Sequence, residues 1–303
     1  MIVEVWADGF LASVLGLADL AQQRWGLPPG GAMDEMALRA ANALVGNPPQ
    51  ALALENGPGL LRLRCLEITH LAVCGAGLTL WRNQQPLPLW TTCLARPGDW
   101  LELRPNGTGC WGYLAISGGF EPTPTVQTGK LLTVKRPSTP PPLAGSFLRT
   151  EQRPAYSQSP RLGLLPGPHL NWLEEDSQQA LFHGSFTLAP SSNRIGYRLH
   201  GQAPLRLRQA ADLLSEGTVT GAVQLPGSGE PVVLMAGRGA TGGYALPAVV
   251  AAADLPLLAQ CLPGAQVTFY PTSLAMAQAR WLDWLNALPN SIIPPEETDL
   301  AWI

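Results

Sequence analysis

Residues 95–103 read ARPGDWLEL, in which a Pro-Gly pair precedes an alternation of apolar and polar side chains. That order predicts a tight turn followed by a strand with one buried face. The pattern returns as CLPGAQVTF at 261–269, and GPGLLRLR at 57–64 returns as GQAPLRLR at 201–208, in the same order along the chain. These echoes predict two halves with one β topology. Their offsets are 166 and 144 residues, so the second half carries 22 additional residues (166 minus 144) between them.

The composition also indicates a mainly β fold. The 303 residues include 32 Gly and 30 Pro, which suit many short strands joined by tight turns better than long helices. Hydrophobic residues make up 46% of the chain and charged residues 14%, which is enough apolar surface for a real core. The formal net charge of −3 supplies no basic field for phosphate backbones and argues against nucleic acid as a partner.

Four segments are predicted along the chain. They are a first half at 1–120, a Pro/Thr/Ser-rich connection at 121–161, a second half with inserted ligand loops at 162–290, and a C-terminal tail at 291–303. The alternation in MIVEVW predicts a first strand at residues 1–6. The spacing of apolar residues predicts helices within 31–47 and 274–288.

Cysteine usage and the terminal sequence bear on location. The five cysteines are an odd number at irregular spacings, which predicts free thiols buried in a reducing compartment. The N-terminal apolar stretch lacks a basic region and is interrupted by acidic residues, so no signal peptide is predicted. No apolar run reaches the length of a membrane span, and the cytoplasm is the predicted location.

The stretch VVLMAGRGATGGYALP at 232–247 contains the spacing G-x-G-x-x-G from Gly237 to Gly242. In dinucleotide sites a helix follows this motif, because the pyrophosphate binds the amides of the helix N-terminus. Tyr244 and Pro247 follow here, which argues against a nicotinamide-dependent oxidoreductase. The four histidines lack metal-ligand spacing, so no metal site is predicted.

Three segments of the second half gather polar side chains among small residues. They are SSNRIGYRLHG at 191–201, LLSEGTVTGAVQLP at 213–226 and the loop at 237–244. Arginine binds a carboxylate bidentately, while glutamine and backbone N–H groups bind amide edges, so the three segments suit a planar acyl or amide ligand. The alternative is that these residues only cap turns and pair on the surface.

Five stretches resemble a known family when they are taken together. They are LPPGGAMDEMALRAANALVGN, GYLAISGGFEP, PSSNRIGYRLHG, LLSEGTVTGAVQLP, and TGGY followed by ADLPLLAQCLPG. In this order, over about residues 1–270, the chain resembles the KipA family. That family is also known as the C subunit of 5-oxoprolinase, and as allophanate hydrolase subunit 2-like or biotin-dependent carboxyltransferase-like.

The resemblance implies a fold of two cyclophilin-like β-barrel domains with a few short helices. It implies a hydrolase complex in which this chain acts with a KipI-like or subunit-B-like protein and a third subunit to open 5-oxoproline to glutamate with ATP. Related domains of urea carboxylase move a carboxyl group from carboxybiotin to urea. The resemblance implies no cofactor tightly bound to this chain, and it leaves the involvement of biotin open.

The chain departs from the family pattern at several places, which include Gly30 where a serine is usual and a short connection TGKLLTV, and two of them remove polar groups of the expected site. The Gln-Asp-x-Gly-Arg signature that usually follows the first strand reads LGLAD at 15–19. In the loop at 237–246, five positions that usually carry an acid, an amide, a hydroxyl, a proline and a lysine are replaced by Gly237, Gly239, Ala240, Ala245 and Leu246. These departures support a second hypothesis, a catalytically eroded binding or regulatory subunit that retains the partner surface.

The residues that match the family pattern define the predicted site. Arg194 and Arg238 are predicted to hold a carboxylate-like or carboxyphosphate-like group. Glu216 is predicted to act as acid or base, and Gln224 and Tyr244 to orient an amide. The predicted set contains catalytic Glu216, Arg238 and Tyr244, and substrate-binding Arg194, Tyr197, Gln224, Thr241, Gly242, Gly243 and Asp34.

Overall fold

The computed structural model describes residues 2–208 and 213–296, and the chain folds into two compact units. The first unit takes Met1–Leu17, Asp34–Ala155 and Trp284–Ile303, and the second takes Ala18–Met33 and Tyr156–Asp283. Both units are discontinuous in sequence, whereas the segments predicted above are continuous. Ala18–Met33 therefore belongs with the second half of the chain, although it lies near the N-terminus.

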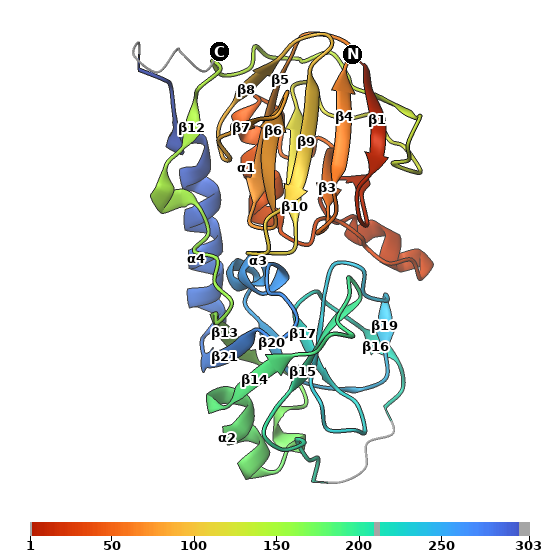
Figure 1. Cartoon of the computed structure of the whole chain (residues 1–303). Helices are drawn as coiled ribbons and strands as arrows, with labels where there is room; N and C mark the ends of the chain where they lie inside the picture. Colours follow the sequence, from red (N-terminus) through yellow and green to blue (C-terminus); the bar gives the residue numbers. More distant parts are fainter. Residues whose placement is uncertain (1, 209–212, 297–303) are drawn as a thin grey trace. The chain divides into compact units, whose positions relative to one another are not determined.

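The first unit is built from two β-sheets (Figure 1). Its elements are β1 (Ile2–Asp8), β2 (Ser13–Leu15), α1 (Glu35–Leu44), β3 (Ala53–Asn56), β4 (Leu61–Cys65), β5 (Thr69–Gly75), β6 (Leu78–Arg82), β7 (Gln85–Leu87), β8 (Cys93–Ala95), β9 (Trp100–Pro105), β10 (Gly112–Ile116), β11 (Leu131–Thr133), β12 (Phe147–Leu148), η2 (Thr150–Gln152), η5 (Leu288–Ser291) and β22 (Ile292–Ile293). The six-stranded sheet has the order β11-β1-β4-β9-β6-β7, and the five-stranded sheet has the order β2-β3-β10-β5-β8. β12 pairs with β22.

One hydrophobic core fills the space between these two sheets. Alternate residues of β4 and β9 point into it, including Leu61, Leu63, Leu101 and Leu103, all fully buried. The five-stranded sheet, on the opposite side of this core, contributes residues such as Leu114. This alternation follows from the two-residue period of a strand, which places every second side chain on one face. The predicted strand at residues 1–6 is confirmed as part of β1.

The helix predicted within 31–47 is α1, which packs against β5 and β10. The Asp34 carboxylate accepts a hydrogen bond from the amide of Ala37 at 2.9 Å and so caps the helix N-terminus. Gly46, with φ of 71°, follows the last turn in the left-handed region that favours glycine. The apolar stripe that predicted this helix is buried, as an amphipathic helix on a sheet requires.

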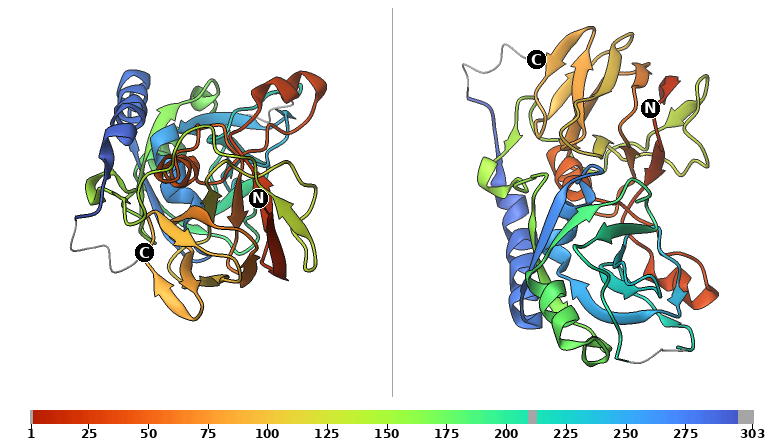
Figure 2. Two further views of the ribbon diagram at one scale, coloured as in Figure 1. Left: turned by 90° about the horizontal axis from the view of Figure 1, so that it is seen from above. Right: turned by 60° about the horizontal axis from the view of Figure 1, so that its bottom comes forward.

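The second unit contains a closed barrel of strand order β13-β20-β17-β18-β15-β14-β21. Its elements are η1 (Leu20–Trp25), β13 (Arg161–Pro166), η3 (Leu170–Trp172), α2 (Glu175–His183), β14 (Ser185–Leu188), β15 (Gly196–His200), β16 (Glu216–Gly217), β17 (Ala222–Leu225), β18 (Val232–Leu234), β19 (Thr241–Gly242), β20 (Ala245–Val250), η4 (Ala252–Asp254), α3 (Leu255–Ala259) and β21 (Gln266–Pro271). α4 (Leu274–Ala287), which confirms the second predicted helix, begins in this unit. Figure 2 shows the barrel strands from two further sides. The predicted mainly β fold is confirmed.

The two echoes have different outcomes. ARPGDWLEL and CLPGAQVTF both lead into strands, β9 and β21, as predicted. GPGLLRLR leads into β4, but 201–208 forms no strand, so that part of the prediction is wrong. Pro204 has no amide to donate to a ladder, and the amide of Arg206 is bound by the Ser177 hydroxyl at 2.8 Å.

The cysteines are free, and four of the five are buried, which confirms the prediction of buried thiols. Burial raises the pKa of the Cys65 and Cys93 thiols to about 12, from an ordinary 9.0. Among the described residues, no helix is both long and apolar enough to cross a bilayer.

These raised pKa values predict a loss of stability at alkaline pH. Above pH 9.0 the unfolded thiol loses its proton, while the folded thiol keeps it until about pH 12. The stabilisation is therefore complete below pH 9.0 and is lost toward pH 12, at up to about 1.4 kcal/mol per pH unit for each thiol. Urea unfolding measured between pH 9 and pH 12 should show that the free energy of unfolding falls less steeply with pH for Cys93→Ala than for wild type. Parallel curves for the two proteins would contradict the prediction.

Candidate ligand site

The loops predicted to carry the site meet in the second unit. β16 pairs antiparallel with β19, which places Glu216 opposite Gly242. The amide of Gly237 donates to the carbonyl of Arg194 at 2.7 Å. The three polar segments of the second half are therefore joined by backbone hydrogen bonds, and they form one loop cluster beside the barrel strand β17.

Arg238 lies at the centre of this cluster and is only 1% exposed. Its Nη1 donates to Thr218 Oγ1 at 2.8 Å and to the Gly239 carbonyl at 3.1 Å, and its Nε donates to Thr220 Oγ1 at 3.1 Å. Burial lowers the pKa of its guanidinium, although an arginine remains charged at any ordinary pH. Within residues 2–208 and 213–296, no carboxylate lies within ion-pair distance of Arg238. A buried cation with only neutral partners favours the approach of an anion.

Thr218 and Thr220 hold this guanidinium, and sequence reasoning did not single them out. The signal was present in the spacing TVT at 218–220, because side chains two residues apart in an extended chain lie on the same face. The Thr218 hydroxyl also donates to the Gly239 carbonyl at 2.7 Å. Thr218 thus accepts from Arg238 and donates to the next residue of the loop.

Thr218→Val is expected to lower the free energy of unfolding by about 1–3 kcal/mol, because it removes a buried acceptor of Arg238 while it keeps the side-chain volume. Denaturant unfolding measures this change. The matched control is Thr241→Val, since Thr241 is exposed and should shift the free energy by no more than about 0.5 kcal/mol. Equal effects of the two substitutions would refute the assigned role of Thr218.

Gln224 reaches the same cluster from β17. Its side chain is 9% exposed and, in the described part of the chain, makes no hydrogen bond. A Cβ atom added at Gly242 would lie 2.2 Å from Gln224 Nε2, so the amide group packs directly on the Gly242 backbone. An amide with no hydrogen-bond partner in the described part of the chain is available to a ligand that carries an amide of its own.

A groove of about 710 Å³ borders this cluster. Gly243 and Tyr244 line it, together with Leu225, which follows Gln224 in β17. Glu174 and Arg206 add charged groups to its wall. Tyr244 is 53% exposed, so its phenol is accessible to a molecule in the groove.

Three predicted residues already have structural partners. The Tyr197 hydroxyl donates to the Ala259 carbonyl at 2.9 Å, and Arg194 Nη2 donates to the Gly31 carbonyl at 2.7 Å. Burial lowers the pKa of Arg194, and Tyr197 partly opposes that effect. Asp34 belongs to the first unit, where its carboxylate caps α1. The ligand roles assigned to all these side chains remain predictions.

A segment from the N-terminal part of the chain adjoins the cluster, and linear sequence reasoning missed it. Gln23 of η1 donates from Nε2 to the Thr218 carbonyl at 3.3 Å. The views in Figures 1 and 2 agree on this placement of η1 near β16 and β19. Gly31 has φ of 93°, and a Cβ there would lie 2.6 Å from the Ala18 nitrogen, which explains a glycine at this position.

The glycine spacing at 237–242 leads into β19 and β20 and not into a helix. The loop therefore lacks the helix N-terminus that a dinucleotide phosphate needs, and the oxidoreductase hypothesis loses its basis. In the part of the chain that the structure describes, no three His, Cys, Asp or Glu side chains are grouped so as to hold a metal ion.

Comparison with known proteins gives the class of this β-barrel protein. A family model described as "Carboxyltransferase domain, subdomain A and B" matches residues 25–128 and 123–271. Since these ranges cover more than half of the chain, the chain belongs to the carboxyltransferase-domain family.

Individual homologous proteins confirm the predicted resemblance. The chain is 31% identical over 278 residues to the C subunit of 5-oxoprolinase from Haemophilus influenzae, covering 88% of this chain and 90% of that protein. It is 32% identical over 268 residues to the corresponding C subunit from Escherichia coli, covering 83% and 85%. The crystal structure of Kluyveromyces lactis urea amidolyase matches 98% of this chain with a TM-score of 0.88. This chain spans 21% of that much longer chain, and at 24% identity the likeness concerns the fold alone.

Proposed function

We propose that this chain is a subunit of a 5-oxoprolinase-like complex, which opens 5-oxoproline to glutamate with ATP. It acts there with a KipI-like or subunit-B-like partner and a third subunit in the cytoplasm. Processing of another small amide by a carboxyltransferase-like reaction is the broader form of the same proposal. The sequence identity of the chain with the C subunits of two 5-oxoprolinases supports the narrower form.

One observation carries the proposal. The loop cluster combines the buried guanidinium of Arg238 with the unpartnered amide of Gln224. A guanidinium attracts a carboxylate, and a primary amide pairs with a cyclic amide through one donor and one acceptor. 5-Oxoproline carries both of these groups on one small ring. Glu216, on the strand next to Gly242, is the acid or base of the proposal.

The complex uses ATP, and we assign its binding to another subunit. The glycine-rich loop of this chain leads into strands, and it lacks the helix N-terminus that binds phosphate in nucleotide sites. We also propose that biotin takes no part in the ring-opening reaction, and that it would enter only with a carboxyl transfer to urea-like substrates.

The test combines the purified chain, its two partner subunits, ATP and 5-oxoproline, and follows glutamate and phosphate release. We expect release that depends on this chain and that falls when Gln224 is replaced by glutamate, because a carboxylate in its place repels the substrate carboxylate. Gln50→Glu serves as the control, since it makes the same change at an exposed position of the first unit. Failure of wild-type chain to support glutamate release would overturn the proposal.

An eroded, non-catalytic subunit is the second candidate, and specific observations favour it. Ala240, Ala245 and Leu246 are all buried at loop positions where the family pattern carries polar residues. Asp19 stands where the pattern has arginine, and it accepts hydrogen bonds from the Ala21 amide and from Gln22 Nε2. In this case the chain binds its partner, yet glutamate release appears only after the missing polar residues are restored.

A further inference from the structure

The outer face of the six-stranded sheet belongs to the first unit, whereas the candidate ligand site belongs to the second. The five-stranded sheet has α1 on its outer side, through β5 and β10. In Figure 1 the strands β6, β9, β4 and β1 lie side by side toward the viewer, with no described helix or strand drawn over them. Most of the outward-pointing side chains of these four strands form what we call the tryptophan–arginine face: Glu4, Trp6, Arg62, Arg64, Thr79, Trp81, Trp100, Glu102 and Arg104.

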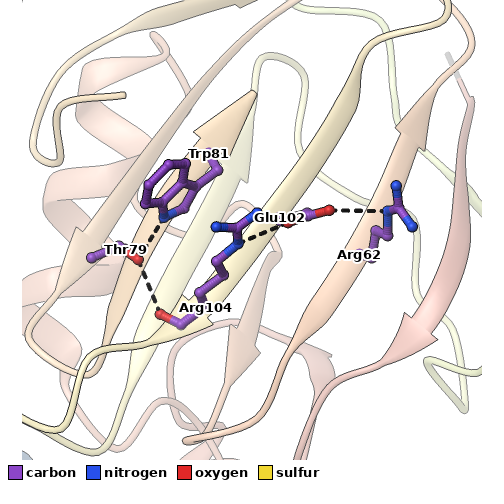
Figure 3. A network of polar contacts seen from close by, with 5 residues as sticks. All are labelled: Arg62, Thr79, Trp81, Glu102 and Arg104. Carbon is purple, nitrogen blue, oxygen red and sulfur yellow. Dashed lines mark hydrogen bonds and ion pairs between the residues drawn. The ribbon is translucent and has the colours of Figure 1, made fainter. Parts of the chain in front are cut away.

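A shared carboxylate organises one part of this face (Figure 3). Glu102 Oε2 accepts from Arg104 Nε at 2.8 Å and from Arg104 Nη2 at 2.5 Å. Arg62 Nε lies 3.1 Å from Glu102 Oε1. Both guanidinium groups are therefore held by one acid, whose side chain is only 13% exposed.

The same guanidinium groups also lie over the faces of tryptophan rings. Arg62 lies 4.4 Å from the centre of the Trp100 ring, and Arg104 lies 4.2 Å from the centre of the Trp81 ring. Trp6 contacts Trp100 edge to face at 4.9 Å between ring centres, and it remains 46% exposed. Stacking on a ring holds a guanidinium flat and leaves its N–H edge free to bind a carboxylate.

Arg64 is the arginine of the face that forms no ion pair among the described residues. It lies 5.6 Å from the centre of the Trp100 ring, and its Nε is buried without a hydrogen-bond partner. Glu4 is opposite Arg64 in the β1–β4 register, yet no ion pair joins the two in the described part of the chain. The face therefore presents three arginines and two carboxylates, and of the two carboxylates Glu102 is the one engaged in ion pairs among the described residues. Its balance is positive, on a protein whose formal net charge is −3.

We propose that the tryptophan–arginine face is a docking surface for an acidic segment of a protein partner. Carboxylates of that segment pair with Arg64 and with the free edges of Arg62 and Arg104, and an apolar residue of it covers Trp6. Charge complementarity and the exposed tryptophan carry the proposal, because buried aromatic and arginine side chains dominate protein interfaces. The identity of the partner as the second subunit of the complex rests on the proposed function.

The test measures binding of the full-length chain to its purified subunit-B-like partner by calorimetry. We expect Arg64→Glu and Trp6→Ala each to weaken affinity by about tenfold or more, because one reverses a charge and the other removes an apolar anchor. Affinity of the wild type should also fall as salt is raised, since screening weakens exposed charge pairs. Arg136→Glu is the control, as Arg136 is exposed and lies after β11, outside the face.

Each outcome separates the docking surface from the function. If wild-type chain forms no complex, the partner named by the proposed function is wrong, and so is its docking here. If the complex forms and both face variants bind as tightly as Arg136→Glu, the docking surface is overturned while the proposed function stands. Circular dichroism and melting of each variant exclude misfolding, and Arg64→Lys, which keeps the charge, should recover part of the affinity. Arg64-dependent retention of a single-stranded oligonucleotide, or Arg64-dependent self-association, overturns the assignment to an acidic partner protein.

Discussion

Arg280→Met is expected to lower the free energy of unfolding by about 3–5 kcal/mol, although its side chain is partly exposed. Arg280 donates through Nη1 and Nη2 to Asp254 at 2.9 and 2.5 Å, and these bonds raise the pKa of the guanidinium. Asp254 is 1% exposed. Removal of the arginine therefore leaves the buried Asp254 carboxylate without a cation, and an unpaired buried carboxylate strongly destabilises the folded state.

The second variant of the same pair sharpens this prediction. Adding Asp254→Asn to Arg280→Met should recover part of the loss, because the new side chain is neutral and its oxygen still accepts from the Gly163 amide, now 2.7 Å from Asp254. Denaturant unfolding of both variants measures the recovery. Arg198→Met is the matched control, since Arg198 is exposed in the same unit and should change stability by about 0.5 kcal/mol or less. A double variant less stable than Arg280→Met would contradict the argument.

The fold could be predicted where local rules and tertiary packing agree. The apolar stripe of α1, its Asp34 cap and the glycine after it all indicate the same helix, and the structure contains it. The prediction fails at 201–208, where the LRLR sequence of β4 recurs but forms no strand. The amphipathic pattern LRLR cannot reveal that Pro204 and Ser177 redirect the chain there. Nor does a linear pattern show that Ala18–Met33 is grouped with the second unit.

The proximity of the three polar segments could be predicted from the sequence, whereas the contacts of their individual side chains could not. Segments rich in glycine and polar residues are joined around β16 and β19, as chemistry alone suggested. Which polar atom faces which neighbour depends on strand register and on loop closure, and the spacing of residues in the sequence predicts neither of them. Tyr197 illustrates this limit, because its phenol binds the Ala259 carbonyl from a strand position that gave no hint of that partner.

Gly242→Ala is expected to reduce substrate turnover by the complex about ten- to a hundredfold, while the free energy of unfolding changes by no more than about 1 kcal/mol. The added Cβ would lie 2.2 Å from Gln224 Nε2 and 3.2 Å from Thr218 Cγ2. Because Nε2 is the far end of a flexible side chain, Gln224 can rotate away at little cost to folding. The rotation removes the amide from its place against Gly242 in the loop cluster, and the ligand loses that contact.

Two comparisons test whether displacement of Gln224 is the cause. In a Gln224→Ala background, Gly242→Ala should have almost no further effect on turnover, because the group it displaces is already absent. Gly217→Ala, which makes the same change on the paired strand β16 where a Cβ meets nothing within 4 Å, should leave turnover as in wild type. If Gly242→Ala lowers turnover equally in both backgrounds, the glycine acts through the loop backbone and the amide of Gln224 has no part in binding. If Gly242→Ala leaves turnover unchanged, the ligand does not approach β19, and the loop cluster at 216–224 and 237–244 is not the site.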